Sequence, residues 1–176
     1  MDALIFVVRS LLQVLLVTLF LLRFLLPLVR AEARNPLSQA VLKITNPLVL
    51  PLRRLLPPAG RIDTASLVAL LVVQLATTAV VFLLLGIGLS RPILLIESAL
   101  LSLVRTLIQF YKFAILIYVI LSWVAPGTYS PAASLLASLC EPLLRPVRSI
   151  IPPLAGLDLS AIFVLIGLQA LEILIT

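Results

Sequence analysis

The feature that most constrains this chain is the stretch 64–90, a run of 27 residues without a charged side chain. As an α-helix this run would be about 40 Å long, whereas about 20 helical residues suffice to cross the hydrocarbon core of a bilayer. The whole chain has 62% hydrophobic and only 11% charged residues, where a soluble domain has about 25% charged residues. We therefore expect a membrane protein.

Three more stretches are apolar enough to span the bilayer, at residues 3–29, 92–126 and 159–176. The second of these has 35 residues and would measure about 52 Å as one helix, which is longer than the hydrocarbon core is thick. We expect it to comprise an amphipathic lead at 92–105 and a span at about 106–126. The predicted fold class is an all-α membrane protein with four transmembrane helices.

Two segments between the spans, 31–62 and 127–157, are rich in proline, leucine and arginine. Proline removes a backbone donor and disfavours helix at the preceding residue, so both segments are interpreted as too broken to span. Backbone groups without partners cannot face hydrocarbon. Each segment should lie in the interface or enter the bilayer as a shielded re-entrant piece.

The two proline-rich segments are copies of each other. An offset of 95 aligns residues 46–74 with 141–169 without a gap, and nine of the 29 pairs are identical. Upstream, an offset of 99 aligns residues 24–27 with 123–126. Composition does not explain the matched prolines, charges and glutamines, which are Pro47/Pro142, Pro51/Pro146, Pro57/Pro152, Pro58/Pro153, Arg53/Arg148, Asp63/Asp158 and Gln74/Gln169.

The repeated unit is thus a span, a proline-rich segment and a second span. The first repeat covers residues 1–90, with spans at about 3–29 and 64–90, and the second covers 91–176. Because two spans return the chain to its starting side, the halves should be parallel repeats, related by an axis along the membrane normal.

The proline-rich pattern resembles that of the YggT (YlmG) family. It is carried by Asn46-Pro47-Leu48-Val49-Leu50-Pro51-Leu52-Arg53-Arg54-Leu55-Leu56-Pro57-Pro58 and by the Asp63 that precedes the next apolar helix. The second copy departs from it, with Glu141 in place of Asn46 and Ser149 in place of Arg54. The resemblance implies a small integral membrane protein of a kind found in bacteria and plastids. It implies no reaction, because the family has no agreed biochemical activity. Relatives have been connected with cell division, osmotic tolerance and, in plastids, nucleoid distribution and cytochrome maturation, which suggests an organising or assembly role at the membrane.

The reactive side chains are few. The chain contains no histidine, and Cys140 is its single cysteine. This removes imidazole catalysis, histidine-ligated metals, internal disulfides and iron–sulfur clusters. An intramembrane enzyme would have to use carboxylates, serine, lysine or tyrosine, and no such constellation is evident. We expect a protein that is not an enzyme and that has no cofactor, metal or nucleotide site.

The basic residues predict the orientation. Net charge is +6, and eight basic residues lie on the side of the proline-rich loops against three on the other. The positive-inside rule places these loops in the cytoplasm and the termini outside, in a bacterial inner membrane. No basic cluster is interleaved with aromatic residues, so nucleic acid is not an expected partner. The eight are Arg30, Arg34, Lys43, Arg53, Arg54, Arg61, Arg145 and Arg148, and the three are Arg9, Arg91 and Arg105.

Asp63 and Asp158 each precede an apolar run, where an aspartate caps a helix N-terminus. The alternative is an ion or proton site paired with Arg53 or Arg148, and a cap can also be salt-bridged. If each arginine folds back on its aspartate, the pair fixes the proline-rich segment against the following span.

The polar residues inside the predicted spans can be interpreted as structural or as functional. Gln74 and Gln169 lie 11 residues beyond the aspartates, near mid-bilayer, where an amide most often bonds another helix and less often lines a pathway. In the third stretch Glu97, Arg105 and Lys112 form a polar stripe, which we interpret as an interfacial amphipathic face feeding the span. Arg23 is near enough to the boundary to snorkel.

We expect a scaffold or assembly factor whose basic segments engage anionic lipid or an acidic protein partner, with a homo-oligomer as a further option. Arg53, Arg54, Arg145 and Arg148 would carry the charge of that surface, and the repeated prolines would shape it. The alternative is a small transporter or channel, because duplication and broken segments are common in transporters.

Overall fold

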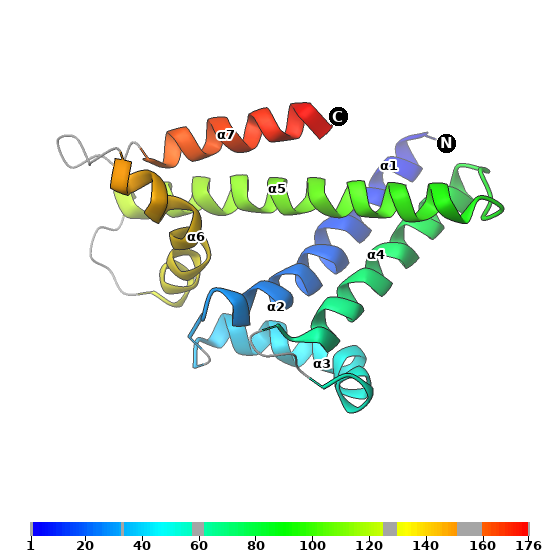
Figure 1. The fold of residues 1–176 in the computed structure, drawn as a ribbon, viewed down its shortest axis with the longest axis horizontal. Helices are drawn as coiled ribbons and strands as arrows, with labels where there is room; N and C mark the ends of the chain where they lie inside the picture. Colours follow the sequence, from blue (N-terminus) through cyan, green and yellow to red (C-terminus); the bar gives the residue numbers. More distant parts are fainter. Residues whose placement is uncertain (1, 33, 58–61, 125–129, 151–159, 176) are drawn as a thin grey trace. The chain divides into compact units, whose positions relative to one another are not determined.

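A computed structural model describes residues 2–32, 34–57, 62–124, 130–150 and 160–175 (Figure 1). These residues form helices, and none of them belongs to a β-strand. In chain order the helices are α1 (Asp2–Leu11), the π-helix η1 (Leu12–Val17), α2 (Thr18–Leu28), α3 (Pro36–Leu55), α4 (Thr64–Leu84), α5 (Pro92–Val124), α6 (Pro131–Ile150) and α7 (Ser160–Ile175).

Among the described residues, three helical stretches are long and apolar enough to cross a membrane. They are Ala3–Leu28, Thr64–Leu84 and Pro92–Ser122, and α7 is a shorter apolar helix of 16 residues. The all-helical fold class and the fit to a membrane protein agree with the sequence. α4 ends earlier than the uncharged run because Gly86 and Gly88 both adopt φ +72°, a conformation that ends a helix.

The interpretation of the proline-rich segments as broken is wrong for the described residues. Both α3 and α6 are helices of 20 residues with two prolines inside, Pro47 and Pro51 in one and Pro142 and Pro146 in the other. Prolines four residues apart share one helix face, and all four side chains are exposed. The carbonyl groups that lose a donor therefore lie on the accessible side, which makes the prolines tolerable.

The opposite face of α3 is buried. Val41, Thr45 and Val49 follow one another at helical spacing, and each is at most 7% exposed. The exposed face carries Lys43, Leu50 and other residues. α3 is thus an amphipathic helix laid against the protein by a narrow buried stripe of two valines and a threonine.

The chain divides into two units, and each is described by itself. The first comprises Met1–Leu28 and Val41–Leu107. Within it α4 packs against η1 and α2, and α3 lies at the end of this pair where α2 stops and α4 starts (Figure 1). The second unit comprises Val29–Ala40 and Ile108–Thr176, and there α6 packs against α7.

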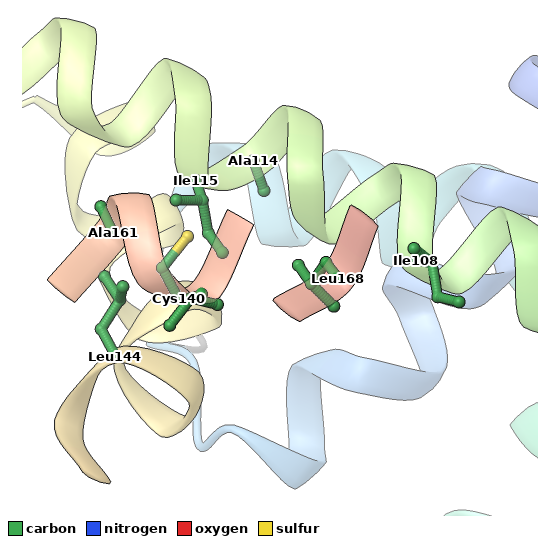
Figure 2. Close-up of a cluster of buried hydrophobic side chains, with 8 residues drawn as sticks. Ile108, Ala114, Ile115, Cys140, Leu144, Ala161 and Leu168 are labelled. Carbon is green, nitrogen blue, oxygen red and sulfur yellow. The ribbon is translucent and has the colours of Figure 1, made fainter. Parts of the chain in front are cut away.

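An apolar cluster forms the core of the second unit (Figure 2). Cys140 and Leu144 of α6 are fully buried in it. α5 and α7 contribute the remaining members, which are Ile108, Ala114, Ile115, Ala161, Val164 and Leu168.

We predict that Cys140 does not react with maleimide in the folded protein. Its side chain is 0% exposed, and burial raises the pKa of the thiol to about 12, so almost no thiolate exists at neutral pH. Mass spectrometry should find no adduct in native micelles at pH 7 and a complete adduct after unfolding. Rapid labelling without denaturant would contradict this packing.

Candidate functional site

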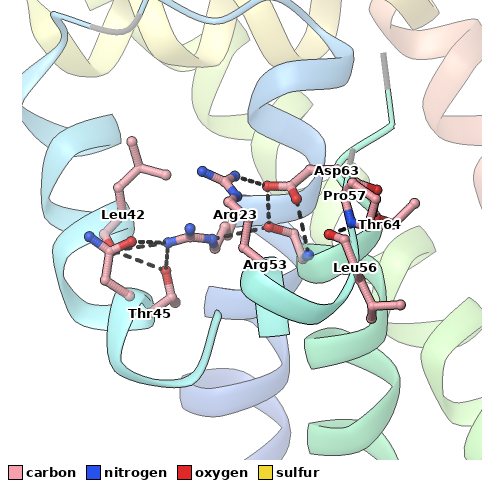
Figure 3. Close-up of polar contacts among 10 residues, drawn as sticks. Arg23, Leu42, Thr45, Arg53, Leu56, Pro57, Asp63 and Thr64 are labelled. Carbon is pink, nitrogen blue, oxygen red and sulfur yellow. Dashed lines mark hydrogen bonds and ion pairs between the residues drawn. The ribbon is translucent and has the colours of Figure 1, made fainter. Parts of the chain in front are cut away.

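A buried arginine lies at the end of the first unit where α3 meets α2 and α4 (Figure 3). Arg23 of α2 is 2% exposed and donates four hydrogen bonds. Its Nε bonds Ser66 Oγ at 3.1 Å, and its Nη1 bonds Thr45 Oγ1 at 2.7 Å and Asn46 Oδ1 at 2.9 Å. The same Nη1 bonds the carbonyl of Leu42 at 3.0 Å. One guanidinium thus joins α2, α3 and α4.

The expectation that Arg23 snorkels is wrong in this structure. A snorkelling arginine extends toward water, but this one turns inward and is satisfied by a carbonyl, an amide and two hydroxyl groups. The fork of guanidinium donors suits this task, because it can bond several acceptors in fixed directions. Sequence reasoning missed the site, since the acceptors are 19 to 43 residues away along the chain.

Asp63 caps α4, as predicted. One of its carboxylate oxygens accepts from the backbone N–H of Ser66 at 3.4 Å, and the other accepts from Ser66 Oγ at 2.8 Å. The second oxygen also accepts from Arg53 Nη2 in an ion pair. Cap and salt bridge therefore coexist, and Arg23, Ser66, Asp63 and Arg53 form a continuous chain of polar contacts (Figure 3).

The Asp63 carboxyl is held in its charged form. Burial would raise its pKa, but the hydrogen bond from Ser66 and the bond and charge of Arg53 outweigh burial, so the pKa lies below its usual value. Asp63 at neutral pH is therefore an anion between two guanidinium groups. This favours a structural role for the Asp63 carboxylate over a role in proton exchange.

We call Arg23, Thr45, Asn46, Arg53, Asp63 and Ser66 the Arg23 cluster. Four of its members, Asn46, Arg53, Asp63 and Ser66, belong to the proline-rich pattern or to the start of the helix that follows it. Ser66 and Thr45 are 0% exposed, so no substrate reaches their hydroxyl groups. The arrangement holds α3 in place, and it offers no accessible nucleophile.

In the second copy the arginine has another partner. Arg148 bonds Glu141 at 3.0 Å within α6, and Glu141 stands where the first copy has Asn46. Arg54 and Arg145, like Pro57, are exposed. The predicted pair of Arg148 with Asp158 lies outside the described residues, as do Pro58, Pro152, Pro153 and Asp158 themselves.

Gln74 bonds another helix, as expected of an amide at mid-span. It is 1% exposed, and its Oε1 accepts from Gln13 Nε2 of η1 at 3.2 Å while its Nε2 donates to Thr78 Oγ1 at 3.1 Å. The Gln13 amide also donates to Thr106 Oγ1 of α5. This small network links η1, α4 and the first half of α5.

Gln169 makes the corresponding contact in the second unit. Lys112 Nζ of α5 donates to Gln169 Oε1 and pairs with Glu172 Oε2 at 2.7 Å, and Gln109 Nε2 donates to Glu172 Oε1 at 3.0 Å. The stripe on the third apolar stretch thus includes an ion pair between two helices, which spacing along the sequence alone did not indicate. In the described part of the chain, no group of three or more His, Cys, Asp and Glu side chains could hold a metal ion.

Comparison with known proteins finds close relatives. The family model CCB3/YggT matches residues 1–84 and 97–176. The uncharacterised protein PA0392 of Pseudomonas aeruginosa is 44% identical over 156 residues, which cover 88% of this chain and 79% of the relative. The uncharacterised protein YggT of Escherichia coli K12 is 33% identical over 172 residues, 98% of this chain and 88% of the relative. No solved structure matches the chain significantly.

Proposed function

The chain belongs to the CCB3/YggT family, and from that premise we propose that it is a non-enzymatic scaffold or assembly factor of the bacterial inner membrane. The observation that carries the proposal is the anchoring of α3 by Arg23 through Leu42, Thr45 and Asn46. A helix held this firmly along one side presents a fixed surface on its other side. By family resemblance, its cellular role lies in division or in envelope and osmotic stress.

The exposed side of α3 suits the surface of an anionic membrane. It combines the cations Lys43, Arg53 and Arg54 with apolar side chains such as Leu50, 49% exposed, and Leu55, 79% exposed. A helix with both kinds of side chain lies in the interface, where its apolar groups enter the lipid and its cations meet anionic headgroups. An acidic protein partner, or a second copy of the chain, would be recruited at the same surface.

α6 provides a second surface of this kind. Arg145 is exposed, Arg148 is half-buried, and Ile150 at the end of the helix is 79% exposed. In this proposal α3 and α6 are the interfacial segments of two parallel tandem repeats, and α7 is the fourth span.

One pair of corresponding contacts supports the tandem repeat. The offset of 95 places Gln74 on Gln169, and the offset of 99 places Gln13 on Lys112. The bond between Gln13 and Gln74 therefore corresponds to the bond between Lys112 and Gln169. The family model also matches the chain in two stretches, one in each half.

The repeats differ where the Arg23 cluster stands. The same offsets place Arg23 on Ser122, Thr45 on Cys140 and Ser66 on Ala161. Cys140 and Ala161 belong to the apolar cluster of the second unit. The first repeat thus holds its interfacial helix with polar contacts, and the second holds its own with apolar packing. Where the second repeat lacks a polar group of the Arg23 cluster, it also lacks the hydrogen-bond partner of that group.

In the proposed topology α3 and α6 lie on the cytoplasmic side and both termini lie outside. The distribution of basic residues favours this orientation. It predicts that single cysteines at positions 34 and 148, in a Cys140→Ala background, are labelled from the cytoplasmic side only. Impermeant maleimide applied to right-side-out and inverted vesicles measures this. Labelling of the two positions from opposite sides would contradict parallel repeats.

We predict that the double variant Arg54→Gln with Arg145→Gln loses anionic lipid. Both side chains are exposed, and neither makes an ion pair in the described part of the chain, so their substitution leaves the fold intact. Each surface cation is worth about 1 kcal/mol toward an anionic membrane, so enrichment of phosphatidylglycerol over phosphatidylcholine around the protein should fall about tenfold or more.

Native mass spectrometry of protein released from mixed nanodiscs measures that enrichment. Arg91→Gln is the control, because Arg91 is exposed and its variant removes a charge on the proposed opposite side. Pull-down from native membranes with the two variants tests the protein partner in parallel. Equal lipid and protein recovery from the Arg54/Arg145 variant and the wild type would refute the proposal.

A small transporter or channel is the second candidate, and one observation favours it. The first unit contains a polar cavity of about 230 Å³ with Arg9, Gln13 and Arg105 in its lining. Ion flux through the purified protein in liposomes would favour this candidate over the scaffold.

A further inference from the structure

The polar cavity of the first unit is lined by three helical segments. α1 and η1 contribute Arg9 and Gln13, one helical turn apart, and α4 contributes Thr77 and Thr78. The first half of α5 contributes Ser98, Ser102 and Arg105, which lie at intervals of four and three residues and so share one face. The cavity is therefore built by side chains from distant parts of the sequence.

The lining of the cavity is rich in donors and in positive charge. Two guanidinium groups, an amide and four hydroxyl groups contribute to it, and no acidic residue is found among the described residues that line it. Apolar side chains of α4, Val81 and Phe82 among them, complete the wall. Two guanidinium groups lining one partly apolar cavity favour an anion.

The backbone beside the cavity is unusual. Gln13 lies in η1, a π-helix of six residues. π-Helical segments are rare in proteins overall, and those that occur are often found at functional sites. Its carbonyl accepts from the backbone N–H and from the Oγ1 of Thr18, and its amide is held by Gln74 and Thr106. Thr77 and Thr78 are 4% and 7% exposed, so the inner wall is fixed before any ligand arrives.

We propose that this cavity binds an oxyanion of the phosphate class, held by the guanidinium groups of Arg9 and Arg105 and by the hydroxyl groups of Ser98 and Ser102. Guanidinium groups bond the oxygens of phosphate in pairs, and serine and threonine hydroxyl groups donate to the remaining ones. The phosphate is free in solution or is the headgroup of a lipid. The site shares no residue with the basic surfaces of α3 and α6, so this proposal can be tested independently of the proposed scaffold.

The test is thermal unfolding of the full chain in an uncharged detergent, followed by circular dichroism. One arm compares inorganic phosphate with chloride at equal ionic strength, and the other compares a short-chain phosphatidylglycerol with the diacylglycerol of the same chains. We expect at least one phosphate probe to raise Tm saturably by about 2–4 °C. Saturation by inorganic phosphate identifies a free anion, and saturation by the lipid alone identifies a headgroup.

The variants assign the effect to the cavity. Arg9→Gln and Arg105→Gln should each weaken the response about tenfold or more. Arg9 is exposed, so its variant keeps the fold even if the Arg105 variant does not. Arg91→Gln should respond as the wild type does in both arms, and Arg54→Gln should do so in the inorganic phosphate arm, because neither residue lines the cavity. Arg54 lies on the proposed scaffold surface, which separates the two proposals.

Three results would overturn the proposal. They are the absence of a saturable response to both phosphate probes, a full response in Arg9→Gln, and an equal loss in Arg9→Gln and Arg91→Gln.

Discussion

Replacing Arg23 with glutamine is expected to lower the free energy of unfolding by about 3–5 kcal/mol, because several buried hydrogen bonds from a charged group are lost together. The substitution removes four hydrogen bonds and leaves Ser66, Thr45 and the Leu42 carbonyl without their charged donor in a buried place. Buried acceptors that lose a partner cost more than the bond itself contributes. Tm should fall by roughly 10 °C.

Unfolding in mixed micelles of increasing dodecyl sulfate content measures this loss. Arg34→Gln is the matched control, because Arg34 is exposed and its variant should remain within about 0.5 kcal/mol of the wild type. Arg23→Lys keeps the charge but loses the fork of donors, so its stability should fall between those of Arg23→Gln and the wild type. If Arg23→Gln is as stable as Arg34→Gln, the Arg23 cluster does not hold α3.

The second large effect concerns Asp63. Asp63→Asn keeps a capping side chain but removes the charge. It should lower the free energy of unfolding by about 1.5–3 kcal/mol, because the hydrogen bonds that Arg53 and Ser66 donate lose their anionic acceptor. Arg53→Gln should cost less, because the Arg53 side chain is 47% exposed and solvent screens the pair. The double variant should lose less than the sum by at least about 0.5 kcal/mol.

Strictly additive losses would show that Arg53 and Asp63 do not act together, and would leave Asp63 as a helix cap. The pH dependence provides a second readout. Because the pKa of Asp63 is lowered on folding, its contribution is fully present above the ordinary value of 3.8 and is lost as the pH falls through the lowered value. Asp63→Asn should remove this acid-sensitive part of the stability.

The sequence predicts best what depends on composition and local spacing. The uncharged run forms α4, Gly86 and Gly88 end it, and Asp63 caps it, because each of these results from the residue itself and its near neighbours. The interhelical bond of Gln74 also follows from its chemistry, since a buried amide needs a partner wherever the partner comes from.

Two features needed the folded chain. The helicity of α3 and α6 depends on the prolines sharing an exposed face, and proline propensity alone predicts the opposite. The role of Arg23 depends on acceptors brought to it by α3 and α4, whereas position in a span suggests only that an arginine reaches for water. The partners of a polar residue that are distant along the chain cannot be predicted from the residues next to it in the sequence.

The exposed prolines of α3 and α6 have a consequence for the proposed interfacial placement of these helices, because they limit how deeply each helix can enter a bilayer. Pro47 and Pro51 each deprive the carbonyl one turn earlier of its N–H, and Pro142 and Pro146 do the same in α6. Such a carbonyl is satisfied by water or a headgroup donor, but in hydrocarbon it would cost several kcal/mol. In the proposed interfacial placement, the prolines would therefore limit the depth of each helix to the hydrated level of the bilayer, however apolar its neighbouring leucines are.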